Sequence, residues 1–297
     1  SFVSCRACGK PIKCPHCDVA LTQHGKNRLV CHYCGYTETF NKVCKECGSP
    51  YVAGFKAGTE KVEGIVKEMV PEARVLRMDA DTTTTKNAHS KILSSFANHE
   101  ADILIGTQMI VKGHDFANVT LAGALAADLS LYASNYMSSE RTFQLLTQAA
   151  GRAGRGDLPG DVVIQTYSPD NYAVTAAARQ DYRSFYEKEI KYRKLMNYPP
   201  VRNMLLIMLS ANDETLADEA ASALAGLIPS RSDILVNGPA AAQVAKVKDM
   251  YKRVIYIKAD SINILTSIKE SLDIYIKNDL SSKGVGVIFD YNPLNFV

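Results

Sequence analysis

Eight cysteines are the residues of this 297-residue chain with the clearest chemistry, and all of them lie within its first 47 residues. They form four pairs with two residues between partners: Cys5/Cys8, Cys14/Cys17, Cys31/Cys34 and Cys44/Cys47. A two-residue gap places two thiolates on one tight turn, and Zn²⁺ takes four such ligands tetrahedrally. The four pairs therefore predict two closed four-cysteine sites, each holding a structural zinc ion.

Consecutive, crossed and nested combinations of these pairs are all open. The 13 residues between Cys17 and Cys31 suit a zinc ribbon, which favours the nested combination. Its inner site is Cys14, Cys17, Cys31 and Cys34, and its outer site is Cys5, Cys8, Cys44 and Cys47. The alternative is the disulfide framework of a small secreted domain. It fits poorly, because no cysteine follows Cys47 and the N-terminus carries no secretory signal.

A second group of candidates lies in the segment 148–155, Gln-Ala-Ala-Gly-Arg-Ala-Gly-Arg. Gln148, Arg152 and Arg155 are spaced by four and three residues, so on a helix they would project from one face. Two guanidinium groups and an amide on one face can grip a polyphosphate. The alternative is a solvated helix end, where arginines are stabilising in any case.

A third group follows the short apolar strand expected at 103–105. Gly106, Thr107 and Gln108 come first, and Lys112-Gly113-His114-Asp115 comes shortly after. A strand that ends in Gly-Thr places a hydroxyl and backbone N–H groups at its carboxyl end, the edge where open α/β sheets bind ligands. For Asp115, a helix or turn cap is the alternative.

Strands alternate with helices in the middle of the chain, which predicts a parallel sheet with helices on both faces. Strands are expected at 74–78, 103–105, 119–125 and 162–164. Helices are expected between Thr59 and Pro71, which ends the first one, and at 85–96, 139–148 and 171–194. Thr59 is the expected N-cap of the first helix. Asp79, Asp81, Thr82 and Thr83 are expected to end a strand and cap the next helix.

Tyr198-Pro199-Pro200 breaks the chain. Beyond it we expect a strand at 203–210, a helix at 214–226, strands at 234–237 and 254–259, a helix at 263–274 and a strand at 285–290. This β-α-β-β-α-β order predicts a small ferredoxin-like α+β domain. The fold class is thus α/β, with three domains: a zinc-binding module at 1–51, a parallel-sheet domain at 52–195 and a C-terminal domain at 196–297.

The composition, 46% hydrophobic and 22% charged, excludes a disordered chain, collagen and a coiled-coil rod. No apolar run approaches the ~18 residues of a membrane span, so no membrane partner is expected. The net charge of +3 indicates little by itself. Lys252 and Arg253 belong to a basic stretch with tyrosines that is a candidate DNA platform. A solvated sheet edge is an equally good interpretation.

The Gly-Thr and Gly-Arg-x-Gly-Arg segments resemble motifs V and VI of superfamily 2 nucleic-acid helicases, on the second of two RecA-like lobes. The four Cys pairs precede the segments "GTEKVE", "RMDADTT", "ADILIGTQMIVKGHDF" and "ERTFQLLTQAAGRAGRG". Together they resemble PriA, the bacterial primosomal replication-restart helicase family, along nearly the whole chain. In that family the zinc module is inserted in the second lobe, the zinc pairing is nested, and a small α/β domain ends the chain.

The resemblance implies an ATP-dependent 3′→5′ DNA helicase that acts at stalled or forked replication structures and assembles the primosome. Carried over, the family's roles divide by ligand: DNA contact by Thr107 and Gln108, nucleotide contact by Gly113 and Asp115, and ATP-phosphate contact by Arg152, Arg155 and Gln148. Implied partners are forked and single-stranded DNA, single-strand-binding protein, and primosome and helicase-loading proteins. The implied location is the cytoplasm, at the nucleoid.

No G-x-x-x-x-G-K-[ST] phosphate loop occurs in the sequence, which also begins without Met. We therefore expect the groups that hold ATP and Mg²⁺ on a first lobe outside this chain, which should be inactive alone. Two structural Zn²⁺ ions would be its own cofactors. One alternative is a non-catalytic, zinc-stabilised DNA-binding and primosome-assembly module. Another is a zinc-ribbon component of transcription or translation machinery, against which the helicase-like segments argue.

Overall fold

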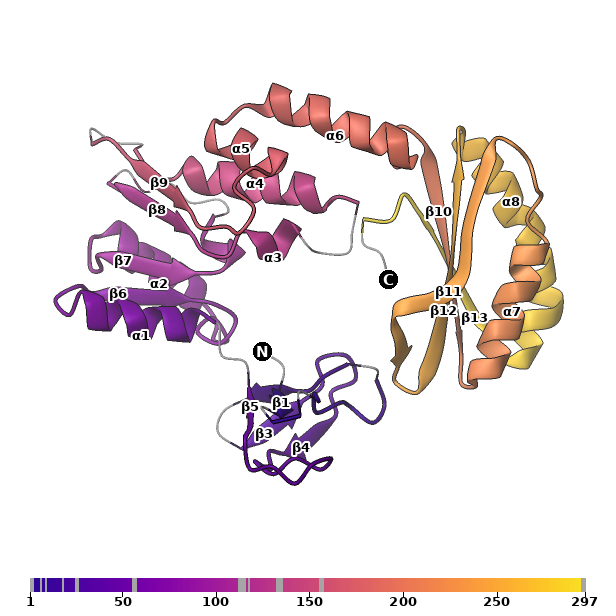
Figure 1. Ribbon diagram of the computed structural model, residues 1–297, viewed down its shortest axis with the longest axis horizontal. Coiled ribbons are helices and arrows are strands. Elements are labelled where there is room, and N and C mark those ends of the chain that lie inside the picture. Colours follow the sequence, from indigo (N-terminus) through magenta and orange to yellow (C-terminus); the bar gives the residue numbers. More distant parts are fainter. Residues whose placement is uncertain are drawn as a thin grey trace. The chain divides into compact units, whose positions relative to one another are not determined.

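A computed structural model describes residues 3–5, 7–8, 10–17, 19–24, 27–54, 58–111, 116, 118–131, 136–154 and 158–294 (Figure 1). Two compact units are present. One is Lys56–Glu189, and the other combines Ser1–Phe55 with Ile190–Val297. The Cys-rich N-terminal segment therefore shares a unit with the C-terminal domain.

Short antiparallel strands build the Cys-rich module. Strands β1 (Val3–Cys5) and β5 (Val52–Gly54) pair with each other, so the chain enters and leaves the module at neighbouring points. Strands β2 (Thr22–His24), β3 (Arg28–Val30) and β4 (Thr37–Thr39) form a three-stranded sheet. Few apolar side chains stand behind them, and five cysteines belong to the same buried cluster. A core this small depends on cross-links or metal for its stability.

The central unit is of the α/β type, as predicted, with two parallel strand pairs: β6 (Val75–Met78) with β7 (Ile103–Gly106), and β8 (Leu121–Ala124) with β9 (Asp161–Ile164). Its helices are α1 (Thr59–Met69), α2 (Ala88–Ala97), α3 (Asp128–Leu131), α4 (Ser138–Ala150) and α5 (Tyr172–Ala178), with a 3₁₀ turn, η1, at Gln108–Val111. In the described part of the chain no ladder joins the two pairs into one sheet.

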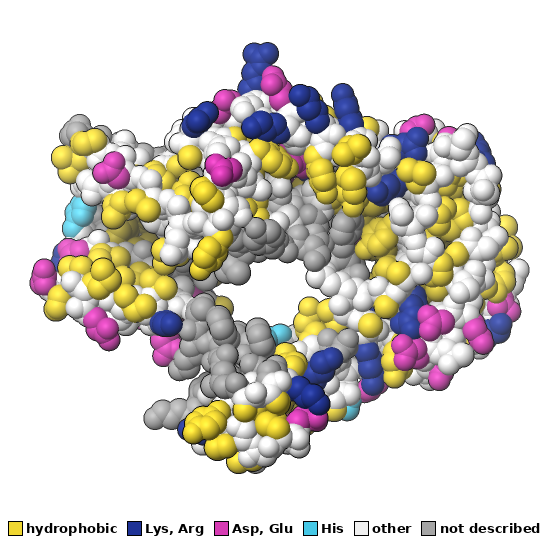
Figure 2. Space-filling model, in the orientation of Figure 1, with side chains coloured by type: hydrophobic (Ala, Val, Ile, Leu, Met, Phe, Trp, Pro, Cys, Tyr) yellow, Lys and Arg dark blue, Asp and Glu magenta, His cyan; other side chains and the backbone are white. Residues whose placement is uncertain are grey.

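The sequence expectations for the start of α1 and for the segment 171–194 are wrong. Gly58, not Thr59, is the N-cap of α1, and Thr59 is the first helical residue. The single helix expected at 171–194 is two helices, α5 and α6 (Tyr182–Met196). Gln180 adopts a left-handed φ of 52° between them, and the Asp181 carboxylate then accepts the Ser184 N–H at 2.9 Å, which starts α6 anew. Exposed Lys and Arg side chains run along α6 (Figure 2).

The C-terminal domain is an antiparallel sheet in the order β11-β12-β10-β13, covered on one face by helices α7 and α8 (Figure 1). The elements are β10 (Asn203–Ala211), α7 (Glu214–Gly226), β11 (Ile234–Val247), β12 (Met250–Ala259), α8 (Ile262–Tyr275), η2 (Ile276–Leu280), η3 (Ser281–Lys283) and β13 (Gly286–Tyr291). Their order and pairing are those of the predicted ferredoxin-like domain.

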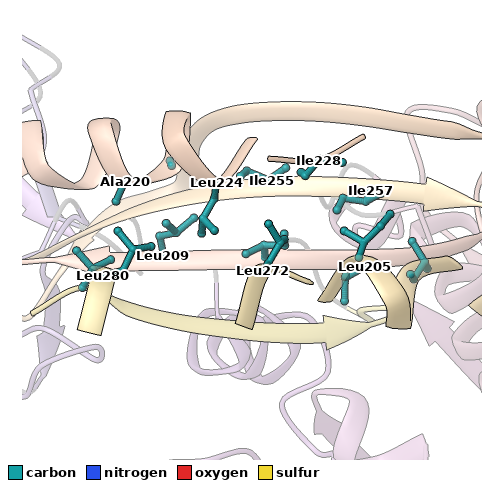
Figure 3. Close-up of a cluster of buried hydrophobic side chains, with 14 of the residues drawn as sticks. Leu205, Leu209, Ala220, Leu224, Ile228, Ile255, Ile257, Leu272 and Leu280 are labelled. Carbon is teal, nitrogen blue, oxygen red and sulfur yellow. The ribbon is translucent and has the colours of Figure 1, made fainter. Parts of the chain in front are cut away.

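Alternation along the central strands decides which side chains form the core. On β10, Leu205, Ile207 and Leu209 point to the helices, and on β12 Ile255 and Ile257 do the same (Figure 3). Each fully buried Leu or Ile stabilises the domain by about 1.5–3 kcal/mol relative to exposure. The strand expected at 234–237 continues to Val247, because bulges after Asn237 and Ala241 let β11 bend past Pro239 without ending.

Candidate metal centres and nucleotide-facing residues

The structure brings the eight cysteines together in the nested combination. Cys5, Cys8, Cys44 and Cys47 form one group, Cys14, Cys17, Cys31 and Cys34 form the other, and the sulfurs of each group lie within 4.8 Å of one another. Between pairs, Cys5 Sγ–Cys47 Sγ is 3.7 Å, Cys8 Sγ–Cys44 Sγ is 3.8 Å and Cys14 Sγ–Cys34 Sγ is 3.6 Å. Four sulfurs at about 2.3 Å from a tetrahedral zinc ion are about 3.8 Å apart. Both groups therefore fit zinc.

Tight turns at the cysteine pairs orient the sulfurs. Gly35 and Gly48 adopt left-handed φ values of 80° and 70° directly after the second cysteine of their pairs, a conformation that favours glycine. The N–H groups of His16 and Tyr36 each point at a sulfur, Cys14 Sγ and Cys34 Sγ respectively, at 3.4 Å. Such N–H···S bonds stabilise thiolate charge. The turns thus prepare the sulfurs for metal before it binds.

Burial distinguishes the two groups. In the inner group Cys14, Cys17 and Cys31 are buried, whereas in the outer group Cys8 and Cys47 are exposed. Burial raises the pKa of the Cys17 thiol to about 12. Burial also acts on Cys31, but the N–H groups of Cys34 and Tyr33 and neighbouring thiols outweigh it and lower that pKa to about 7. Zinc binding must therefore displace protons from the inner site.

The Gly106–Thr107 step lies at the carboxyl end of β7, as expected from the sequence. A Cβ on Gly106 would lie 2.5 Å from Ile110 Cγ2 and 2.6 Å from the Met78 carbonyl oxygen, so only glycine fits. Thr107 and Gln108 follow immediately and are exposed. The closely packed glycine thus fixes where these two polar residues emerge.

Asp79 has a role that the sequence did not indicate. It is 7% exposed at the end of β6, and its carboxylate accepts hydrogen bonds from the Thr59 hydroxyl and from the N–H groups of Asp81 (3.0 Å) and Thr82 (2.9 Å). Arg77 Nε lies 3.1 Å from Asp79 Oδ2. Burial would raise the pKa of Asp79, but these partners outweigh it and lower the pKa.

Asp79 therefore fastens the start of α1 to the edge that carries Thr107. The expectation that residues 79–83 cap the next helix is wrong, because α2 begins at Ala88 and its N-cap is Asn87. The repeated Asp and Thr of "RMDADTT" could have indicated a local turn instead. Such side chains often bond to nearby backbone, as the Thr82 and Thr83 hydroxyls do here with the Asp79 carbonyl oxygen.

Two of the candidate phosphate-gripping residues, Gln148 and Arg152, do not share one helix face. Gln148 is exposed on α4, but the helix ends at Ala150 with Gly151 as C-cap, and Arg152 lies in the following turn. Beyond it, Gly154 has a φ of 74°, and a Cβ on Gly160 would collide with the Gly154 backbone nitrogen. The glycines therefore permit backbone to pack on backbone. Arg155, Gly113 and Asp115 lie outside the described residues.

Lys252 and Arg253 point to opposite faces of β12. Lys252 is partly exposed, whereas the Arg253 side chain is 6% exposed on the helix side of the sheet. Its guanidinium donates to Asp218 at 2.5 and 2.8 Å and to Glu214 at 2.9 Å. The carboxylates of α7 therefore already engage the Arg253 donors.

Among the residues that the structure describes, no helix is long and apolar enough to cross a bilayer.

Three family models match the chain. The PriA DNA helicase Cys-rich region domain matches residues 14–38, the helicase conserved C-terminal domain matches 38–157, and the primosomal protein N C-terminal domain matches 194–294. The order of these matches follows the order of the structural parts: cysteine turns, parallel strand pairs and ferredoxin-like sheet.

Curated relatives point the same way. The chain is 42% identical over 296 residues to the replication restart protein PriA of Bacillus subtilis, and 39% identical over 304 residues to that of Synechocystis. The PriA of Chlamydia trachomatis is 38% identical over 300 residues. The alignments cover 99%, 99% and 98% of this chain, but only 37%, 36% and 39% of the relatives' lengths. With its two groups of four cysteines, helicase-type lobe and C-terminal sheet domain, the chain belongs to the PriA family of replication restart proteins.

Proposed function

We propose that this chain supplies the zinc module, the second helicase lobe and the C-terminal domain of an ATP-dependent DNA helicase that restarts replication. The observation that carries the proposal is the carboxyl edge of β6 and β7. There, a glycine that tolerates no side chain presents exposed Thr107 and Gln108, and buried Asp79 fastens α1 to the same edge. Phosphate–sugar backbones are bound by such hydroxyl, amide and N–H groups.

ATP would lie between this lobe and a first lobe that supplies the phosphate loop and the Mg²⁺ ligands. Arg152 and Arg155 would stabilise charge on the transferred phosphoryl group, with Gln148 near the γ-phosphate, and Gly113 and Asp115 would contact the nucleotide. Alternate closing and opening of the lobes would carry Thr107 along one strand in the 3′→5′ direction. The chain alone would not hydrolyse ATP, because its sequence has no phosphate loop.

Two Zn²⁺ ions would hold the Cys-rich module together, since the eight thiolates satisfy two tetrahedra and leave no open position for catalysis. The proposed substrates are forked and single-stranded DNA. The proposed partners are single-strand-binding protein and the primosome and helicase-loading proteins, in the cytoplasm at the nucleoid. Lys252 stays a candidate DNA contact. For Arg253 we favour a structural role, because α7 engages its donors.

The test uses a protein of the relatives' full length that contains this chain. Forked-DNA-stimulated ATP hydrolysis is measured for the wild type, Arg152→Ala and Arg155→Ala, with DNA affinity recorded in parallel. An arginine finger predicts a fall in turnover of about 10³-fold or more with DNA affinity retained. Unchanged turnover in both variants would contradict the assignment. Lost DNA affinity with unchanged turnover would favour a non-catalytic DNA-binding and assembly module.

A further inference from the structure

The turn between β11 and β12 reaches from the C-terminal domain to the Cys-rich module. Lys248 and Asp249 form the turn with left-handed φ values of 52° and 60°, and Val247 pairs with Met250 across it. Two consecutive left-handed residues make the tight hairpin whose twist matches antiparallel strands. The end of this long hairpin is therefore a tight, defined turn.

Three hydrogen bonds join this turn to the Cys14–Cys17 turn. The Lys248 N–H donates to Cys17 Sγ at 3.3 Å, and the Asp249 N–H donates to the His16 carbonyl oxygen at 3.0 Å. Asp249 Oδ2 lies 2.6 Å from His16 Nδ1. Val247 packs against the cluster that contains the cysteines, so apolar contact accompanies the polar bonds.

The Lys248 N–H does for Cys17 what nearby backbone N–H groups do for other cysteines of the inner site: it donates a hydrogen bond to the sulfur. Cys14 and Cys34 accept N–H groups from residues two positions away, His16 and Tyr36. The donor to Cys17 comes from 231 positions away, in a different domain. Cys17 is 2% exposed, so water does not replace a missing donor there. A buried thiolate without a hydrogen-bond donor is costly.

We propose that the β11–β12 turn is an outer-shell part of the inner zinc site, so that zinc binding and docking of the C-terminal domain on the Cys-rich module stabilise each other. The proposal rests on the proposed zinc occupancy. It makes Asp249 a positioning residue: its side chain holds the turn against His16, and the Lys248 N–H then meets Cys17 Sγ. The outer site, with Cys8 and Cys47 exposed, gains no such support from the turn.

The first test detects the bond itself. Cadmium-113 replaces zinc in the chain, and nuclear magnetic resonance identifies each bound cadmium by its couplings to cysteine β-protons. The Lys248 amide proton should couple to the cadmium that also couples to Cys17, because scalar coupling passes through an N–H···S–Cd hydrogen bond. Two bound cadmium ions with no coupling at Lys248 would overturn the docking inference alone. Failure to bind two metal ions would overturn the zinc proposal and this inference with it.

The second test measures loss of each cadmium signal to an excess of chelator. Asp249→Gly keeps a residue suited to positive φ but removes the carboxylate, so the inner ion should leave about ten- to a hundredfold faster while the outer ion is unaffected. Lys248→Gly is the matched control in the same turn, because it keeps all three hydrogen bonds and should leave both rates unchanged. Equal inner-site rates for Asp249→Gly and wild type would overturn the proposal.

Discussion

Arg253 offers a sharp test of the packing of the C-terminal domain, because its ion pair is unequally buried. The Arg253 side chain is 6% exposed, whereas those of Asp218 and Glu214 are 57% and 60% exposed. The carboxylates hold the pKa of Arg253 above its usual value, and its guanidinium lowers the pKa of Asp218. Removing Asp218 breaks its two bonds to Arg253 and leaves the bond to Glu214, whereas removing Arg253 breaks all three. The group left behind differs as well.

The unequal burial of the two partners determines how much stability each substitution should cost. Asp218→Ala leaves a buried cation that has lost two charge-assisted hydrogen bonds, which should cost about 2–3 kcal/mol. Arg253→Met keeps an apolar stem of similar length and returns two exposed carboxylates to water, so its cost should be about 1 kcal/mol. As a control, Asp233→Ala breaks the exposed Arg231–Asp233 pair, which should leave the exchange of the sheet nearly unchanged.

Amide hydrogen exchange of β10 and β12 measures these costs in one domain of a multidomain chain. About 1 kcal/mol corresponds to roughly fivefold faster exchange and about 2 kcal/mol to roughly thirtyfold. Faster exchange in Arg253→Met than in Asp218→Ala would refute the reasoning. Weaker DNA binding by the full-length Arg253→Met protein, with unchanged exchange of the sheet amides, would also contradict it. That result would make Arg253 a DNA contact.

Further predictions concern the other parts of the chain. Gly106→Ala should displace the Thr107 step at a cost of about 1–3 kcal/mol and reduce DNA-stimulated ATP turnover in the full-length protein, whereas Gly123→Ala, with open space around it, should not. Hydrogen bonds from Arg74 lower the pKa of Asp102 to about 2, so their stabilisation should be present above the ordinary value of about 3.9 and lost as pH falls toward 2. Thermal melting should therefore find Asp102→Asn less stable than wild type above about pH 4, and the gap should close as pH falls through about 2. A gap that does not narrow over this range would contradict the lowered pKa. Calorimetric titration of the metal-free chain with zinc in buffers of different ionisation enthalpy should show proton release and an affinity that rises with pH, because the Cys17 thiol is protonated at neutral pH. Zinc binding without proton release would contradict the raised pKa.

Local signals made much of the fold predictable. Cysteine spacing favoured the nested grouping, because the 13 residues between Cys17 and Cys31 suit a zinc ribbon. Alternating apolar residues led to the order of the C-terminal elements, since one buried face fixes side-chain direction along each strand. The length of β11 was underestimated, because Gly238 and Pro239 are typical of a strand end and bulges that tolerate them leave no local mark.

Long-range partners were beyond the sequence. Arg253 belongs to a basic stretch, and only the packing of α7 against β12 reveals its carboxylate partners. The Lys248–Cys17 bond spans 231 positions, and no periodicity indicates it. Gln180 adopts a left-handed φ after α5, and glutamine is not a residue type that marks a helix end in a sequence.

Strand separation on a fork tests the central claim most directly. The full-length protein is mixed with labelled forks whose duplex is reached from either a 3′ or a 5′ single-stranded arm, with ATP or a non-hydrolysable analogue. We predict ATP-dependent separation from the arm that allows 3′→5′ movement, and none with the analogue or with the 297-residue chain alone. Separation by the isolated chain, or fork binding by an intact protein that never separates strands with ATP, would contradict it.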